Sequence, residues 1–232
     1  MAVDLRDIRT VVLPGTGSDD DYLYRAFYPA LRRAGAITRP HRPQPAGLIA
    51  GYLRALEEAA QDGPIAVAGV SLGAAVAVSW AITHPDLAVA VLAALPAWTG
   101  SPAHAPAALA ALHTATELRR DGLEVTIARM RESSPSWLAA ELSRSWTNQW
   151  PGLPDAMVEA AHYVAPTTDQ LSELSAPMAV VSASYDPVHP LAVGVQWVAA
   201  APRAALRTVT LEQIGTDPSI LGSACLAALD DI

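Results

Sequence analysis

The chain has 232 residues, of which 51% are hydrophobic, and a net charge of −8 at pH 7. This length and composition suit one α/β domain with a large core. The acidic charge argues against nucleic acid as a partner, because binding to a phosphate backbone requires clustered positive charge. All 15 basic residues are arginines, which excludes lysine Schiff-base chemistry and a P-loop lysine.

The remaining bulk features predict a soluble cytoplasmic protein with no membrane partner. Cys225 is the single cysteine, so no intrachain disulfide can form and no oxidising compartment is implied. The first residues carry acids and do not resemble a signal peptide, and no uninterrupted apolar stretch reaches about 18 residues. The six histidines are scattered without metal-ligand spacing, so we expect neither a metal nor another cofactor.

Apolar strands and helical segments alternate through the first 96 residues. We expect strands at 10–13, 36–38, 64–68 and 87–95, and helices at 22–34, 48–61 and 74–83. Three acids, Asp19, Asp20 and Asp21, precede the first helix, where negative charge is favourable. The alternation predicts an α/β fold with a doubly wound, mostly parallel sheet covered by helices on both faces.

Residues 97–165 interrupt this alternation with helical patterns alone. We expect helices at 107–120, 123–131, 136–146 and 155–162. We interpret this segment as a helical cap inserted between two parts of one core, residues 1–96 and 166–232. In the second part we expect strands at 178–181 and 205–211, helices at 191–200 and 219–229, and loops at 183–190 and 212–218.

The sequence Gly69-Val70-Ser71-Leu72-Gly73 lies between the strand at 64–68 and the helix at 74–83. Strand, Gly-x-Ser-x-Gly and helix together are typical of a nucleophile elbow. In such a turn the serine is strained, and a side chain two positions to either side would collide with neighbouring backbone. We therefore predict that Ser71 is a catalytic nucleophile.

A serine site also needs an acid, a base and two donors to an oxyanion. Asp186 follows the strand at 178–181, which is the position of the acid in the chain order Ser, Asp, His. We expect the backbone N–H of Leu72 to be one oxyanion donor. We expect the other to be the backbone N–H of Thr16, in the glycine-rich loop after the first strand.

These features resemble the α/β-hydrolase superfamily over nearly the full chain, and small actinobacterial hydrolase-like proteins in particular. The resemblance lies in Leu-Pro-Gly-Thr-Gly-Ser-Asp at 13–19, Gly-Val-Ser-Leu-Gly at 69–73, Leu-Pro-Ala-Trp-Thr-Gly at 95–100, Gln-Trp-Pro-Gly-Leu at 149–153 and Asp-Pro-Val-His-Pro at 186–190. It implies an α/β-hydrolase fold and serine-dependent chemistry.

The chain departs from the superfamily pattern at the catalytic histidine, which normally follows the last strand. Thr216 stands in that segment, and no histidine follows His189. A threonine hydroxyl is no general base near neutral pH. Three explanations remain open. His189 supplies the imidazole from the acid loop; Thr216 is an engineered replacement of the histidine; or the protein has lost hydrolysis and binds without catalysis.

The expected reaction is hydrolysis or acyl transfer on a small ester or thioester with a hydrophobic or aromatic acyl group. Trp98, Trp146 and Trp150 are the candidate pocket residues, because they lie in or beside the cap. Relatives of this fold act as thioesterases and acyltransferases in bacterial secondary metabolism. Transfer from an acyl carrier protein is therefore an alternative, for which the cap offers Arg119, Arg120, Arg129, Arg131 and Arg144 as a basic surface. An inactive binding protein is the other alternative.

Overall fold

A computed structural model describes residues 3–232, which contain one six-stranded sheet in the order β2-β1-β3-β4-β5-β6. All neighbouring strands are parallel. The strands are β1 (Arg9–Leu13), β2 (Ile37–Pro40), β3 (Ile65–Val70), β4 (Ala88–Ala94), β5 (Met178–Ser184) and β6 (Ala204–Thr210). The prediction of a doubly wound parallel sheet is confirmed.

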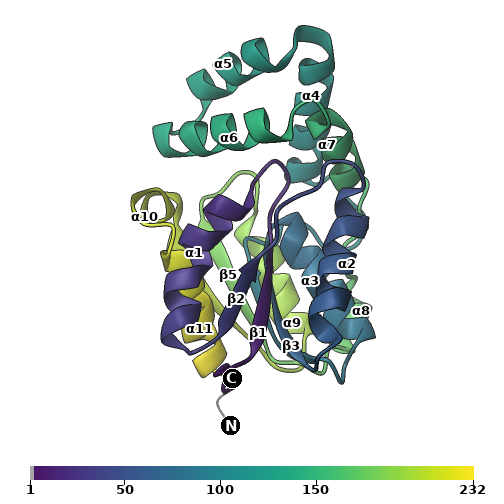
Figure 1. Cartoon of the computed structure of the whole chain (residues 1–232), viewed down its shortest axis with the longest axis vertical. Helices are drawn as coiled ribbons and strands as arrows, with labels where there is room; N and C mark the ends of the chain where they lie inside the picture. The colour runs from purple at the N-terminus through teal and green to yellow at the C-terminus, as the bar shows by residue number, and fades with distance from the viewer. Residues whose placement is uncertain (1–2) are drawn as a thin grey trace.

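Helices cover both faces of this sheet, as the alternating pattern predicts (Figure 1). They are α1 (Asp20–Arg33), α2 (Leu48–Ala60), α3 (Leu72–Thr83), α4 (Pro106–Asp121), α5 (Leu123–Ser133), α6 (Ser136–Gln149), α7 (Leu153–Ala161), α8 (Thr168–Ser172), α9 (Leu191–Ala200), α10 (Leu211–Thr216) and α11 (Ile220–Asp230). One apolar cluster joins the sheet to α2, α3 and α9. A second joins its other face to α1 and α11.

Burial on both faces explains the composition of the central strands and of α3. Every residue of β3 is buried, which is why this strand is a continuous apolar run rather than an alternating one. Helix α3 is apolar around nearly its whole circumference because it packs on β3 and β4 and is flanked by α2, so most of its residues are buried. The single thiol, Cys225 on α11, is fully buried, and burial raises its pKa.

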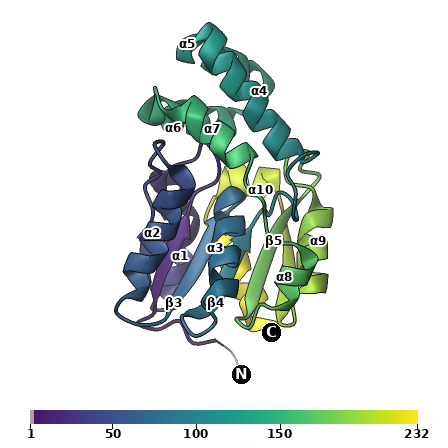
Figure 2. The ribbon, with the colours of Figure 1, turned by 90° about the vertical axis from the view of Figure 1, so that its right-hand side faces the viewer.

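The helices α4, α5, α6 and α7 follow β4 in sequence and lie over the carboxyl ends of the strands (Figures 1 and 2). They lie within residues 97–165, the cap. Helix α7 is hydrogen-bonded to the helix layer beneath it. Its Glu159 accepts from the N–H groups of Leu48 and Ile49 at 2.9 and 3.0 Å. A carboxylate from the cap therefore satisfies the first backbone donors of α2, whose own N-cap is Gly47.

Two short helices, α8 and α10, were not expected from the sequence. The prediction of a loop at 212–218 is therefore wrong, because α10 occupies most of this segment. Both helices begin with a reciprocal capping box, Thr167 with Gln170 and Thr210 with Gln213. The signal was present as Thr-x-x-Gln in each case. Each helix is shorter than the span over which apolar periodicity becomes visible, so periodicity alone does not predict it.

No helix in residues 3–232 combines the length and apolar character needed to span a bilayer.

We expect the glycines of α2 and α3 to respond differently to alanine. A Cβ on Gly73 would lie 2.3 Å from the Leu13 carbonyl oxygen, whereas a Cβ on Gly51 would meet nothing closer than 3.8 Å. Gly73→Ala should lower the free energy of unfolding by about 3 kcal/mol through overpacking. Gly51→Ala should raise it by about 0.5 to 1 kcal/mol, since both glycines lie in helices. Urea denaturation compares them, and equal effects would contradict the steric explanation.

Candidate active site

Ser71 occupies a strained turn between β3 and α3, with φ 54° and ψ −115°. A Cβ on Gly69 would lie 2.3 Å from the carbonyl carbon of Gly73, which itself lies against the backbone of Leu13. The predicted steric reason for the two glycines is therefore confirmed. The turn holds the Ser71 side chain at the amino end of α3, where the helix dipole favours negative charge.

Left-handed backbone recurs at the ends of three neighbouring strands. Ser71 follows β3, Leu95 follows β4 and Tyr185 follows β5, with φ of 54°, 51° and 60°. Such conformations cost about 1–3 kcal/mol each for residues other than glycine. Their concentration at the carboxyl edge of the sheet agrees with the rule that ligands of open α/β sheets bind beyond this edge.

Asp186 folds the loop that follows β5. Its Oδ1 accepts hydrogen bonds from the backbone N–H groups of Val188 at 2.8 Å and His189 at 3.1 Å. Its Oδ2 lies 2.9 Å from Nδ1 of His189. Burial of Asp186 opposes ionisation, but the hydrogen bonds from His189 and Val188 outweigh it and lower the pKa of the carboxyl. The loop therefore holds an ionised carboxylate against the imidazole.

The other imidazole nitrogen, Nε2 of His189, lies 3.1 Å from Oγ of Ser71. The tautomer protonated at Nδ1 donates to Asp186 and leaves Nε2 free to accept from the Ser71 hydroxyl. Ser71 and Asp186 are buried, and the His189 side chain is 19% exposed. The structure thus brings together the three residues named by the first of the three explanations.

Thr216 does not share this environment. It is exposed at the end of α10, and its hydroxyl donates to the Glu212 carbonyl oxygen one turn earlier at 2.9 Å. The neighbouring Gly215 lies against Trp137 of α6, where a Cβ would approach within 2.3 Å of the indole. The segment after β6 is therefore a helix packed under the cap rather than an extended loop.

The predicted oxyanion donors belong to Leu72, which follows Ser71, and to Thr16, in the loop after β1. Leu72 is the first residue of α3, so its N–H has no acceptor inside the helix. Gly15 packs beside the serine, since a Cβ there would lie 3.3 Å from Cβ of Ser71. Thr16 follows in a turn closed by the Ser18 N–H and the Gly15 carbonyl oxygen at 3.0 Å. The roles of Leu72 and Thr16 remain predictions.

The three candidate pocket tryptophans occupy different surroundings. Trp98 is buried and donates from Nε1 to the Tyr163 carbonyl oxygen at 3.2 Å. Trp146 is also buried and lies over Gly17, where a Cβ would be 2.7 Å from Nε1. Its Nε1–H finds no hydrogen-bond partner among residues 3–232. Trp150 is 40% exposed. Only Trp146 combines burial, a position over the β1–α1 loop and an unpaired donor.

A surface hollow of about 520 Å³ lies beside the loop that carries Asp186. It is lined by Ala97, Trp98, Thr99, Gly100, Ser101, Ala103, His104, Ala105, Pro106, Thr167, Thr168, Pro190, Val193 and Gln196. Of the three tryptophans only Trp98 reaches it, and neither Ser71 nor His189 belongs to its lining. No group of three or more potential metal ligands occurs in the described part of the chain.

A sequence profile of the serine aminopeptidase S33 family matches residues 49–214, which are more than half of the chain. The chain belongs to this family of α/β hydrolases. Members of the S33 family are usually hydrolytic enzymes, and the matched region includes Ser71, Asp186 and His189. No curated protein sequence matches the chain.

Solved structures extend the S33 α/β-hydrolase fold over the rest of the chain. MenH from S. aureus has a TM-score of 0.74 and 14% identity, with 97% of this chain and 94% of MenH covered. A carboxylesterase structure from Nitrososphaera gargenis has a TM-score of 0.73 and 14% identity, with coverage of 91% and 85%. The enol-lactonase from Burkholderia xenovorans LB400 has a TM-score of 0.66 and 17% identity, with coverage of 89% and 84%. At these identities the likeness is one of fold.

The lowered pKa of Asp186 predicts a pH-dependent contribution to folding. A carboxyl whose pKa is lower in the folded state stabilises the protein above its unfolded pKa of about 3.9, and that stability is lost as the pH falls through the folded pKa. Asp186→Asn should therefore reduce the free energy of unfolding at about pH 6, and the difference should shrink below about pH 4. Asp86→Asn, at an exposed carboxylate, is the control. Denaturation at both pH values tests this, and a difference that grows in acid would contradict it.

Proposed function

We propose that this α/β hydrolase cleaves small carboxylic esters or thioesters through an acyl-enzyme on Ser71, with His189 as general base and Asp186 as its orienting acid. The observation that carries the proposal is the pair of contacts made by one imidazole. Its Nε2 lies 3.1 Å from Oγ of Ser71, and its Nδ1 lies 2.9 Å from Asp186. Both distances lie within the reach required of a nucleophile, its base and the group that orients the base.

The proposed reaction begins when Oγ of Ser71 attacks the carbonyl carbon and Nε2 of His189 takes the hydroxyl proton. The ionised Asp186 stabilises the imidazolium that forms. The carbonyl oxygen becomes an oxyanion, to which the N–H groups of Leu72 and Thr16 donate. Collapse of the intermediate breaks the ester or thioester bond, and the leaving alcohol or thiol takes the proton from Nε2. Water then repeats the sequence on the acyl-serine, which releases the carboxylic acid and restores the hydroxyl of Ser71.

The position of the imidazole supports the first of the three explanations for the missing C-terminal histidine. His189 reaches Ser71 from the loop after β5, so the proposed chemistry needs no base from α10. Thr216 as a replaced histidine would leave His189 without a purpose beside the serine. A binding protein without catalysis would have no need for an ionised carboxylate that orients an imidazole toward a strained serine.

Transfer from an acyl carrier protein receives no support from the arginines of the cap. Arg119 contacts Asp155 at 2.5 Å, Arg120 contacts Asp121 at 2.7 Å, and Arg129 contacts Glu117 at 3.3 Å. Because the charges of these three arginines are balanced locally, and Arg144 is paired with Asp19, four of the five arginines do not add up to a positive surface for an acidic partner. Water is therefore the acceptor that we propose.

Serine labelling and turnover test the proposal. A fluorophosphonate probe should label the parent protein and fail to label Ser71→Ala. His189→Ala should lower kcat for p-nitrophenyl and thiophenyl esters by about 1,000-fold or more. His113→Ala is the matched control, because that side chain is 74% exposed on α4, and it should retain full activity. Absence of labelling at high probe concentration, or equal rates for His189→Ala and His113→Ala, would contradict the proposal.

We further propose that the indole N–H of Trp146 donates to the bound substrate. The support is a buried donor over Gly17 that has no partner among residues 3–232, since an unmet buried donor costs about 1–3 kcal/mol unless a ligand accepts from it; the donation requires that substrate binding uncovers the indole. Trp98 offers a contrast, because its own N–H is already bonded to Tyr163. Trp150 is too exposed to form a pocket wall, and we assign it no part in binding.

Phenylalanine variants distinguish the role of Trp146 in substrate binding from the role of Trp98 in stability. Trp146→Phe should leave the melting temperature unchanged or slightly higher, because no internal hydrogen bond is lost, while kcat/KM falls about 10-fold. Trp98→Phe should instead lower the free energy of unfolding by about 1 kcal/mol through loss of the bond to Tyr163. Thermal denaturation and ester kinetics on both variants test this. Unchanged kcat/KM in Trp146→Phe would show that its N–H serves no substrate.

A further inference from the structure

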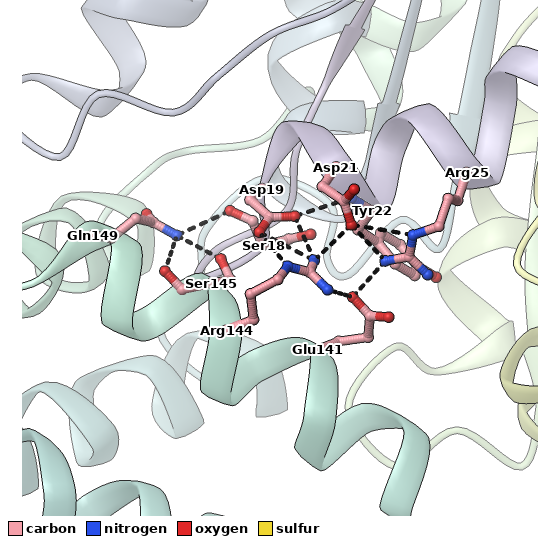
Figure 3. A network of polar contacts seen from close by, with 9 residues as sticks. All are labelled: Ser18, Asp19, Asp21, Tyr22, Arg25, Glu141, Arg144, Ser145 and Gln149. Carbon is pink, nitrogen blue, oxygen red and sulfur yellow. Dashed lines mark hydrogen bonds and ion pairs between the residues drawn. The ribbon is translucent and has the colours of Figure 1, made fainter.

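Helix α6 of the cap lies against the loop between β1 and α1 through one row of polar side chains. Glu141, Arg144, Ser145 and Gln149 follow the spacing i, i+3, i+4 and i+8, which places them on one face of the helix. Figure 3 shows this row facing Ser18, Asp19 and Asp21. The contacts join segments separated by about 125 residues, so no local preference of the sequence explains them.

Arg144 forms a bidentate ion pair with Asp19. Nε and Nη2 of Arg144 lie 3.2 and 2.9 Å from the two carboxylate oxygens. The Asp19 side chain is 7% exposed, and it also caps α1 by accepting from the Tyr22 N–H at 2.9 Å. A buried carboxylate is costly without a cation and hydrogen bonds. Arg144 therefore fixes Asp19, and with it the start of α1.

Gln149 holds the residue before Asp19. Its amide nitrogen donates to the Ser18 carbonyl oxygen at 3.0 Å and lies 2.8 Å from Oγ of Ser145. The Ser18 N–H closes the turn to Gly15, so both backbone groups of Ser18 are engaged. Gln149 is itself buried. The turn is therefore held at its Gly15 end by Ser71 and at its Ser18 end by α6.

Thr16 lies between these two anchors. We propose that Arg144 and Gln149 of the cap are positioning residues, which hold the Gly15–Ser18 turn so that the Thr16 N–H meets the oxyanion formed on Ser71. This inference rests on the proposed function. Its physical reason is that an oxyanion donor acts only when it is fixed in advance at the place where charge develops. The cap then contributes to the rate of the chemical step as well as covering the site.

Two variants remove these contacts while keeping apolar bulk. In Arg144→Met and Gln149→Met, kcat per active site should fall about 10- to 100-fold, with KM changed less than about 2-fold. Active sites are counted by fluorophosphonate titration. Arg25→Met is the matched control, because Arg25 bonds Asp21 and Glu141 in the same network without touching Ser18 or Asp19. It should retain the parent kcat.

Inhibitors separate positioning from simple loss of structure. An alkyl trifluoromethyl ketone forms an oxyanion on the serine, and its affinity should fall in parallel with kcat in both variants. An alkyl methyl ether with the same alkyl group has no carbonyl and forms no oxyanion. Its affinity for both variants should equal its affinity for the parent protein. Equal losses for both compounds, or variants that match Arg25→Met in kcat, would overturn the inference.

A further variant distinguishes loss of positioning from destabilisation by the Asp19 carboxylate, which Arg144→Met leaves buried without its cation. In the double variant Asp19→Asn with Arg144→Met no uncompensated charge remains, so its melting temperature should return toward that of the parent while kcat stays low. Recovery of kcat together with stability would overturn the inference. A parent protein that neither labels nor turns over ester would instead refute the proposed function, which distinguishes the two failures.

Discussion

The contact of backbone with backbone at the turn after β3 is the constraint on which the site depends. Gly69 packs on Gly73, and Gly73 packs on the carbonyl groups of Leu13 and Pro14, with no space for a Cβ at either glycine. This contact forces Ser71 into a left-handed conformation and brings the end of β1 beside it. The proposed nucleophile and the loop with the proposed second oxyanion donor are thereby placed by one steric condition. The strain at Ser71 is offset by the buried apolar packing of β3 and α3.

The imidazole reaches this serine by an unusual route for the fold. The superfamily pattern expects it after the last strand, but here that segment is α10, which caps its own first turn and lies against the cap at Trp137. The loop after β5 carries both the acid and the imidazole, and the carboxylate of Asp186 folds the loop by accepting from two backbone N–H groups. A single short loop thus orients His189 through the same carboxylate that folds the loop.

Besides a shared apolar cluster, polar groups join the cap to the core at the β1–α1 loop and at the start of α2. Glu159 of α7 satisfies the first donors of α2, and Arg144 of α6 balances the buried Asp19. Of the cap arginines that the sequence offered as a basic surface, Arg144 is the one that pairs with a core carboxylate. Burial makes these pairs demanding in geometry, because an unpaired charge there is expensive. The cap is therefore held in one orientation over the carboxyl edge of the sheet.

Much of this architecture followed from local patterns. Apolar runs and helical periodicity predicted the six strands and most helices, and the two glycines around Ser71 predicted the strained turn, because each depends on neighbours within a few residues. Asp186 and His189 are close enough in sequence for one turn to join them. In contrast, the approach of His189 to Ser71 spans 118 residues and that of Arg144 to Asp19 spans 125. Such pairs carry no local signature, since they form only when packing of the sheet, the loops and α6 brings distant segments into contact.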